Sequence, residues 1–353
     1  MVSARAEIIT RRTYNRPLDD TGLNFETWRQ TIARVVDHQE WLWSRQLGRD
    51  LNDLEYAELY DLEQFMLDRK LSMSGRTLWL GGTDVAKQRE ASQFNCSFTE
   101  VETVYDVVDV LWLLLQGCGV GAKPIVGTLN GFSKPIKTIN VINSTRTSKG
   151  GNDFNTETWN PDTGEWVIQI GDSAEAWAKS IGKLLAGKYP ARTLTLDFSQ
   201  LRPAGERLKG YGWISSGDRA ISVAYVAIAN ILNGRADALL SRIDIMDIIN
   251  WLGTILSSRR SAEIILFEYG QPEWEEFALA KKDFWLYNRE HRTQSNNSLV
   301  FTSKPDRDEL KHIFTLMEEA GGSEPGFING VEALRRAPWF KGSNPCVVLI
   351  RLK

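Results

Sequence analysis

Three cysteines are the side chains with the most reactive chemistry in this sequence of 353 residues. Cys96, Cys118 and Cys346 are too few and too scattered for a disulfide scaffold, and the sequence has no CxxC, HxxxH or HExxH spacing for a metal site. We therefore expect thiol or redox chemistry without a protein-held metal, in a reducing compartment such as the cytosol. Cys346 follows a Pro turn and is a better candidate for reactivity than Cys96, which by default is a small buried residue in a strand.

Glycines and arginines supply two weaker signals. The cluster Gly117–Gly121 could cradle a phosphate, but it lacks the GxGxxG spacing and follows a predicted helix, so by itself it is more typical of a helix end and turn. Arg259-Arg260 lies between a predicted helix and a predicted strand. The pair could complement the dipole of the helix or clamp a phosphate, and the local sequence leaves both interpretations open.

The composition excludes several classes of protein. With 42 Lys+Arg against 45 Asp+Glu, the net charge of −3 argues against a broad basic surface that coats nucleic acid. The longest apolar run, Val107–Leu115, is interrupted by Asp109, so we expect no membrane span, and the first fifteen residues show no secretory signal. A charged fraction of 25% and an aromatic fraction of 10% exclude a disordered chain.

The elements predicted to position these residues fall into two parts. The start of the chain is helical, and in the rest of the chain helices and strands alternate. Helices are predicted over Phe25–His38 and Asp53–Arg69, the second capped by Asp53, and Leu71–Thr83 is predicted to be a loop feeding a short strand. Further helices are predicted over Val104–Gln116, from Asp172 to about Leu185, over Ile221–Leu240, over Ile245–Leu256 capped by Asp244, and over Asp306–Ala320 with Pro305 at its first position. Strands are predicted over Thr193–Ser199, Ala262–Phe267 and Ser298–Thr302, with a hairpin at Trp159–Trp166. This alternation predicts an α/β sheet with helical cover.

A series of short motifs in one order carries a resemblance to a known family. The motifs are Arg12-Thr13-Tyr14, Ser74-Gly75-Arg76-Thr77-Leu78-Trp79, Gly82-Thr83-Asp84, Asn95-Cys96-x-Phe98, Gly117–Gly121, Asp197-Phe198-Ser199 with Arg202-Pro203, Arg259–Glu263, Ser295–Ser298, Glu324-Pro325-Gly326 and Asn344-Pro345-Cys346. Together they resemble the catalytic chain of adenosylcobalamin-dependent (class II) ribonucleotide reductases, closest to the small monomeric type.

The resemblance implies an α/β fold in two parts. An N-terminal helical region would cover residues 1–70. Residues 71–353 would form roughly the first half of a ten-stranded α/β barrel, with effector-binding loops at about 125–260 and a finger loop at 342–346.

The resemblance also implies roles for individual residues. Cys346 corresponds to the cysteine that becomes a thiyl radical, Asn344 to the residue that hydrogen-bonds the ribose, and Cys96 to one of two cysteines that reduce the 2′ carbon. The implied substrate-binding residues are Ser72, Ser74, Asn95, Gly119 and Gly121, with the serines near the substrate phosphates. Cys118 stands where relatives have Gly, and we interpret it as incidental.

The implied ligands are a ribonucleotide, adenosylcobalamin, an external dithiol or thioredoxin-like reductant, and a deoxynucleotide (dNTP) effector. Likeness to the monomeric type favours a triphosphate substrate. Two loops resemble the apparatus that senses the effector: Trp213–Arg219, with Ser216, Asp218 and Arg219, and Leu256–Glu263, with Arg259 and Arg260.

The sequence departs from the family pattern directly after Cys346. Val348 stands where relatives have a glutamate that acts as a general base, and the family's second half-barrel is absent. We therefore expect the isolated chain to be inactive and to need a C-terminal half, and we hypothesise an intron or a split gene. The alternative is an inactive nucleotide-binding remnant or regulatory module. A third interpretation, a cobalt-independent reductase with a separate radical-generating subunit, fits the motifs less well.

Overall fold

The computed structural model describes residues 3–19, 22–208, 211, 213–256 and 263–346. The chain divides into two compact units. The first unit consists of Met1–Asn95 with Arg207–Trp213, and the second of Cys96–Glu206 with Ile214–Lys353. Within the described ranges, no helix is both long enough and apolar enough to cross a membrane.

The first unit is helical, as predicted. Its elements are α1 (Ala4–Thr13), α2 (Trp28–Leu47), α3 (Asp53–Leu67), α4 (Gly75–Leu80), α5 (Asp84–Gln88) and the 3₁₀ turn η1 (Glu90–Gln93). Ile32, Val35, Met66 and Leu78 form its buried core. The cap of α3 differs from the prediction, because the side chain of Asn52 accepts the backbone N–H groups of Leu54 and Glu55, and Asp53 is the first helical residue.

The prediction of a loop feeding a strand over residues 71–83 is wrong. Gly75–Leu80 forms the short helix α4, which begins where Ser74 Oγ accepts the backbone N–H of Thr77 at 3.2 Å. Ser, Gly and Thr residues that alternate with Leu and Trp suggested a loop and strand, but Leu78 and Leu80 are buried in the helical unit. The N-cap serine was the stronger local signal.

The second unit is built on a five-stranded, fully parallel sheet. Its order is β1 (Cys96–Val101), β2 (Gly119–Pro124), β9 (Glu263–Glu268), β10 (Ser295–Phe301) and β11 (Gly326–Asn329). Parallel pairing requires helical crossovers, and the helices between these strands provide them. The structure therefore has an α/β fold with N-terminal helices and parallel strands.

Alternation along the strands gives the five-stranded sheet two different faces. Val120, Ile265 and Leu299 belong to the large core with the helices. Phe98 and Leu266 belong to a smaller cluster on the opposite face, together with Ile264, Val300, Ala333, Ala337 and Phe340. Cys96, Gly119 and Gly121 share the face of Phe98, since Cys96 pairs with Gly119 and Phe98 with Gly121.

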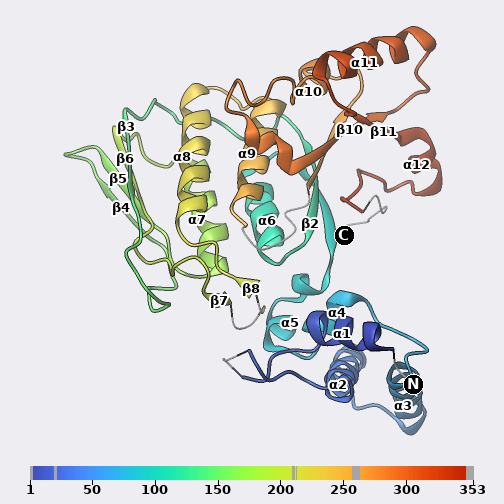
Figure 1. Cartoon of the computed structure of the whole chain (residues 1–353). Coiled ribbons are helices and arrows are strands. Elements are labelled where there is room, and N and C mark those ends of the chain that lie inside the picture. Colours follow the sequence, from blue (N-terminus) through green and yellow to red (C-terminus); the bar gives the residue numbers. More distant parts are fainter. Residues whose placement is uncertain (1–2, 20–21, 209–210, 212, 257–262, 347–353) are drawn as a thin grey trace. The chain divides into compact units, whose positions relative to one another are not determined.

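Four helices lie between this sheet and a second one (Figure 1): α6 (Val104–Leu115), α7 (Ala174–Ala186), α8 (Arg219–Gly234) and α9 (Arg242–Thr254). The second sheet has the order β3 (Thr138–Ile142), β6 (Thr193–Asp197), β5 (Glu165–Gln169) and β4 (Thr156–Asn160). The predicted hairpin is confirmed as β4–β5, in which Trp159 pairs with Trp166. The predicted strand over Thr193–Ser199 is confirmed as β6.

Smaller elements complete the chain: β7 (Arg207–Leu208), β8 (Trp213–Ile214), α10 (Trp274–Ala278), the 3₁₀ turn η2 (Glu290–Gln294), α11 (Arg307–Ala320) and α12 (Gly330–Arg336).

Three predicted helix starts are corrected by a residue or more. Ser173 caps α7, since Asp172 pairs with Arg202. Ser241 caps α9, with Asp244 as the reciprocal partner of a capping box. Asp306 caps α11, so Pro305 lies before the cap.

Candidate active site

Two cysteines that are 250 positions apart in the sequence meet in the second unit. The sulfur atoms of Cys96 and Cys346 lie 2.9 Å apart, and both residues are free thiols. Cys96 opens β1 and is half-buried, whereas Cys346 is exposed. The third thiol, Cys118, is fully buried. The fold therefore brings together the two cysteines to which chemistry was assigned.

Two glycines allow the segment Gly342–Cys346 to lie against the sheet. A Cβ on Gly121 would overlap the backbone oxygen of Ser343, and a Cβ on Gly342 would overlap the ring of Phe98. Only glycine at both positions permits this close approach of backbone to strand. Gly121 was expected to admit substrate, and the structure shows that it admits the Cys346 segment itself.

Asn344 holds the turn that carries Cys346. Its side chain is 2% exposed, and its Oδ1 accepts the backbone N–H of Cys346 at 3.0 Å. This bond closes an Asx-type turn around Pro345 and fixes the backbone of the cysteine. The neighbouring Ser343 is equally buried, and its hydroxyl has no hydrogen-bond partner among the described residues.

The surroundings of Cys96 keep its sulfur protonated. Burial, followed by the hydrogen bond with Cys346, raises the pKa of the Cys96 thiol to about 11. At neutral pH this residue is therefore a thiol, which can give up a hydrogen atom or a proton, and is a poor thiolate nucleophile. Two adjacent thiols of unequal exposure can act in sequence, the exposed one as initiator and the half-buried one as hydrogen donor.

The remaining predicted substrate residues lie in both units. Gly119 is buried in β2 and pairs with Cys96 in the second unit. Ser72, Ser74 and Asn95 belong to the first unit, where all three are exposed. The hydroxyl of Ser74 caps α4, and Asn95 Oδ1 accepts a hydrogen bond from Arg76 Nε at 3.3 Å.

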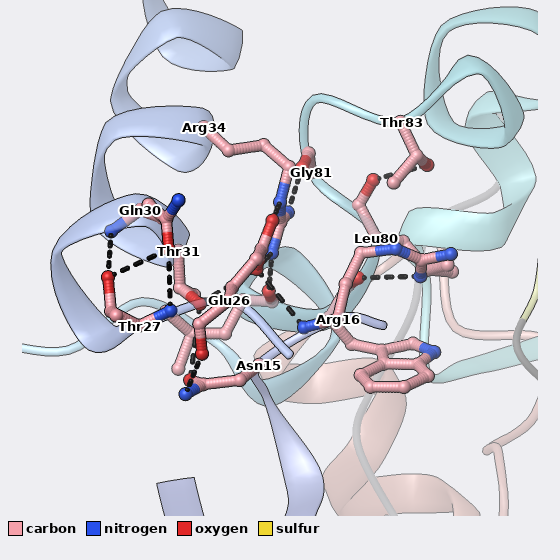
Figure 2. A network of polar contacts seen from close by, with 12 residues as sticks. Asn15, Arg16, Glu26, Thr27, Gln30, Thr31, Arg34, Leu80, Gly81 and Thr83 are labelled. Carbon is pink, nitrogen blue, oxygen red and sulfur yellow. Dashed lines mark hydrogen bonds and ion pairs between the residues drawn. The ribbon is translucent and has the colours of Figure 1, made fainter. Parts of the chain in front are cut away.

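A buried polar network in the first unit holds α4 in place (Figure 2). Arg34 pairs with Glu26 at 2.7 Å and donates to the carbonyl oxygens of Leu78 and Gly81, while Arg16 donates to the carbonyl oxygen of Trp79 at 3.0 Å. Burial alone would raise the pKa of Glu26, but the hydrogen bonds and charge of Arg34, together with hydrogen bonds from Arg16 and Thr31, lower that pKa. Two cations thus neutralise the carboxyl end of α4.

The motifs at residues 12–14 and 74–79 are joined by a direct contact. A Cβ on Gly75 would lie 3.3 Å from the ring of Tyr14, so the tyrosine packs against the first residue of α4. This contact explains why a glycine follows the N-cap serine.

The first predicted effector loop leads into α8. Asp218 precedes the helix, and its Oδ2 accepts the backbone N–H of Ser144 at 2.8 Å. Ser216 is half-buried, while Arg219 is exposed at the first helical position. In the second predicted loop, Arg259 and Arg260 lie outside the described residues.

A buried polar cluster at the start of β9 was not anticipated from the sequence. Glu263 is 2% exposed, and its Oε2 accepts a hydrogen bond from Asn250 Nδ2 at 3.1 Å. The same amide donates to Ser295 Oγ at 3.1 Å, and this hydroxyl donates to Asn297 Oδ1 at 2.9 Å. The available signal was an acidic residue that directly precedes the apolar run Ile264–Phe267.

Comparison with known proteins identifies the relatives of this chain. The ribonucleotide reductase alpha domain matches residues 2–83. The adenosylcobalamin-dependent ribonucleoside-triphosphate reductase of Lactobacillus acidophilus is 27% identical over 90% of this chain and 47% of its own length. The corresponding enzyme of Euglena gracilis is 26% identical over 97% of this chain and 46% of its own length.

A solved structure agrees in fold. A crystal structure of a B-12 dependent (class II) ribonucleotide reductase matches with a TM-score of 0.74 and 21% identity, over 96% of this chain and 52% of that chain. The sequence and the fold of this chain are thus similar to those of ribonucleotide reductases over about half of their length. The chain is a homologue of the class II, adenosylcobalamin-dependent ribonucleotide reductases, and it spans about half the length of the relatives it matches.

Proposed function

We propose that this chain supplies the N-terminal half of a ribonucleotide reductase active site, in which ribonucleotides, with triphosphates favoured, are reduced by thiyl-radical chemistry. The observation that carries the proposal is the contact between the sulfurs of Cys96 and Cys346, 2.9 Å apart on one face of a parallel sheet. In this proposal Gly342–Cys346 is the finger loop, and the five-stranded sheet is half of the barrel around it.

Each residue of the pair has a distinct task. The exposed Cys346, held by the turn at Asn344, loses a hydrogen atom to become a thiyl and then takes a hydrogen atom from the ribose. Cys96 stays protonated at neutral pH and, with a second thiol from outside this chain, supplies the two electrons and two hydrogens that replace the 2′ hydroxyl by hydrogen. The hydroxyl leaves as water, the two sulfurs join in a disulfide, and Cys346 returns its hydrogen atom to the ribose. The oxidised Cys96 sulfur needs a second thiol and an external dithiol to return to its starting state.

Cys346 suits a radical cofactor because this residue is exposed, whereas Cys96 is half-buried. When bound, adenosylcobalamin supplies the radical that begins the chemistry. The part played by this chain is to hold Cys346 on a rigid turn and to keep the second thiol within reach.

Nucleotide contacts are proposed for residues outside the cysteine pair. Ser72 and Ser74 are the proposed contacts for the substrate phosphates, and Asn95 is a further proposed substrate contact; all three residues are exposed. Ser216, Asp218 and Arg219, with Arg259 and Arg260, are the proposed contacts for a dNTP effector. The exposed guanidinium of Arg219 at the start of the 16-residue helix α8 suits an anion.

An exposed apolar surface supports the proposal of a C-terminal partner half. β11 is the last strand of the five-stranded sheet, so within the described ranges one of its edges is unpaired. Phe327, Val331, Leu334 and Trp339 lie on and after this strand and are 39–50% exposed. Open strand edges and contiguous apolar surface are typical of sites that another segment covers.

Complementation tests the proposed activity. The chain is mixed with a polypeptide that corresponds to the remaining half of the Lactobacillus acidophilus enzyme, together with adenosylcobalamin, a dithiol and each ribonucleoside triphosphate, and deoxynucleotide formation is measured. Product is expected with the wild-type chain and with Cys118→Ser, since Cys118 is fully buried and has no part in the proposed chemistry. None above background is expected with Cys346→Ser.

The failure of this assay would favour the second candidate, an inactive nucleotide-binding module. Binding of a dNTP without product, under conditions in which the two halves associate, would contradict the reductase proposal.

A further inference from the structure

The two thiols of the proposed site lie close enough to react with each other. The sulfur atoms of Cys96 and Cys346 are 2.9 Å apart, and both residues are free thiols. A disulfide bond is about 2.05 Å long, so the two sulfurs would have to approach by less than ~1 Å to form one. In the proposed function Cys96 pairs instead with a thiol from outside this chain, so a bond to Cys346 would compete with that chemistry.

The backbone holds both thiols in place for this bond. Cys96 is the first residue of β1 and pairs with Gly119 of β2, which carries no side chain beside the Cys96 thiol. Gly121 admits the backbone of the segment that carries Cys346, and Asn344 Oδ1 accepts the backbone N–H of that cysteine at 3.0 Å. Since both ends are already ordered, closing the bond costs little further conformational entropy.

The unequal exposure of the two thiols sets the order in which they react. Cys346 is exposed, so it is the thiol that meets an oxidant from solution. Cys96 is half-buried, and burial followed by the hydrogen bond with Cys346 raises the pKa of its thiol to about 11. Cys96 is therefore a poor attacking group for an external reagent, but it lies next to any adduct formed on Cys346.

The oxidation proceeds by two exchanges with a low-molecular-weight disulfide such as oxidised glutathione. The Cys346 thiolate attacks this disulfide, forms a mixed disulfide and releases one reduced glutathione. Cys96 then loses its proton and attacks the Cys346 sulfur, and the second glutathione leaves as its thiol. The two cysteines lose two electrons and two protons, which the oxidised glutathione gains.

We propose that Cys96 and Cys346 form a reversible disulfide that switches off the proposed active site. This consequence rests on the proposed function, in which Cys346 must be a free thiol to become a thiyl and Cys96 must be a free thiol to act as a reductant. One bond thus blocks both tasks, and a dithiol restores them. Cys118, which is fully buried, takes no part in the switch.

A glutathione titration tests the bond itself. The wild-type chain, Cys96→Ser, Cys346→Ser and the control Cys118→Ser are reduced, freed of reductant and treated with increasing amounts of oxidised glutathione. Reduced glutathione is held at about 1 mM, below the effective concentration expected for two adjacent thiols. Free thiols are trapped by acid, and peptide mass spectrometry quantifies thiols, mixed disulfides and intramolecular disulfides.

We expect the Cys96–Cys346 disulfide in the wild type and in Cys118→Ser. Cys96→Ser should stop at the mixed disulfide on Cys346, and half-conversion should need roughly a hundredfold more oxidised glutathione than in the wild type. In Cys346→Ser, Cys96 should stay largely reduced. A wild type that accumulates the mixed disulfide, that needs as much oxidant as Cys96→Ser, or that joins Cys96 to Cys118 would overturn the inference.

A single-turnover assay tests the consequence. The reduced and the glutathione-oxidised wild-type chains are each mixed with the remaining half of the Lactobacillus acidophilus enzyme, adenosylcobalamin and a ribonucleoside triphosphate, without dithiol. Product is expected from the reduced chain, none above background from the oxidised chain, and product again after dithiothreitol treatment. Equal product from both chains would overturn the switch. No product from the reduced chain would contradict the proposed function and with it the switch, while the titration would still show whether the disulfide forms.

Discussion

At the scale of single residues, two side chains of this chain have pKa values well above their ordinary values. Cys96 and Glu263 are both held in their protonated forms at neutral pH, the first beside an exposed thiol and the second inside the helical core. In both cases burial is the larger cause of the raised pKa. A thiol that remains protonated suits hydrogen transfer, and a neutral acid suits a buried structural contact.

The cysteines should differ in their reaction with iodoacetamide. At pH 8 Cys346 is expected to react first because it is exposed, while Cys96 has a very small thiolate fraction and Cys118 is fully buried. Cys346→Ala should accelerate labelling of Cys96, because it removes a hydrogen bond that raises the Cys96 pKa and opens access to the sulfur. Peptide mass spectrometry against time gives the order, and faster labelling of Cys96 in the wild type would contradict this description.

The stability of the chain should depend on pH through Glu263. The folded-state pKa of about 8 exceeds the ordinary value of 4.5, so the folded state binds more protons between these values. The free energy of unfolding therefore falls as the pH rises through this window. Glu263→Gln should flatten this decline, and urea unfolding at pH 5, 6, 7 and 8 measures it. If the free energy of unfolding of the wild type and of Glu263→Gln fell in parallel as the pH rises, the Glu263 carboxyl would not be the cause of the decline.

At the scale of elements, close contacts between backbone segments position the proposed site. The Cys346 segment crosses β2 at Gly121, so a methyl group there would push Ser343 off the strand. Gly121→Ala should prevent the Cys96–Cys346 disulfide that diamide would otherwise form by taking two electrons and two protons from the thiols. Gly234→Ala in α8 is the matched control, since nothing lies within 4 Å of its added methyl. Mass spectrometry of the oxidised peptides distinguishes the two variants.

The network around Arg34 makes an energetic prediction for the first unit. Arg34→Ala leaves the Glu26 carboxylate buried without its cation and frees the carbonyl groups of Leu78 in α4 and of Gly81 directly after it, so unfolding should become easier by about 3–5 kcal/mol. Arg45→Ala on the same helix breaks the exposed pair with Glu90 and the contact of the guanidinium with the Trp41 ring, and should cost about 1 kcal/mol. Chemical denaturation measures both, and equal losses would show that burial does not set the strength of the Arg34 pair.

Much of the architecture followed from local sequence signals, and the exceptions have physical causes. The hairpin at Trp159–Trp166 and the strand of Cys96 were predicted because turn residues and alternation are local properties. Helix α4 was not predicted because six residues are too few for a helical periodicity to be visible in the sequence. Its stability depends on tertiary contacts with Arg34 and Tyr14. The resemblance to known enzymes selected Cys96 and Cys346, but the contact of Gly121 with Ser343 depends on residues over 200 positions apart.

At the scale of the molecule, the proposed active site lies on a five-stranded sheet whose outer strands, β1 and β11, each have one unpaired edge within the described residues. The helical face of the sheet is buried under α6 and α9, whereas α12 and the Cys346 segment cover the opposite face in part. The relatives are about twice as long as this chain. In the proposed function, the apolar residues on and after β11 are the proposed contact for a C-terminal half.

Charged substitutions on α12 test this surface. Val331 and Leu334 are three residues apart on α12 and are 50% and 43% exposed, so Val331→Lys and Leu334→Lys should leave the chain folded. Each should weaken binding of the C-terminal half by at least roughly tenfold, because association would bury an unpaired ammonium group. Val223→Lys, on an exposed position of α8, should leave binding unchanged. Isothermal titration calorimetry gives the affinities. If all three substitutions changed the affinity equally, the contact with the C-terminal half would not lie on β11 and α12.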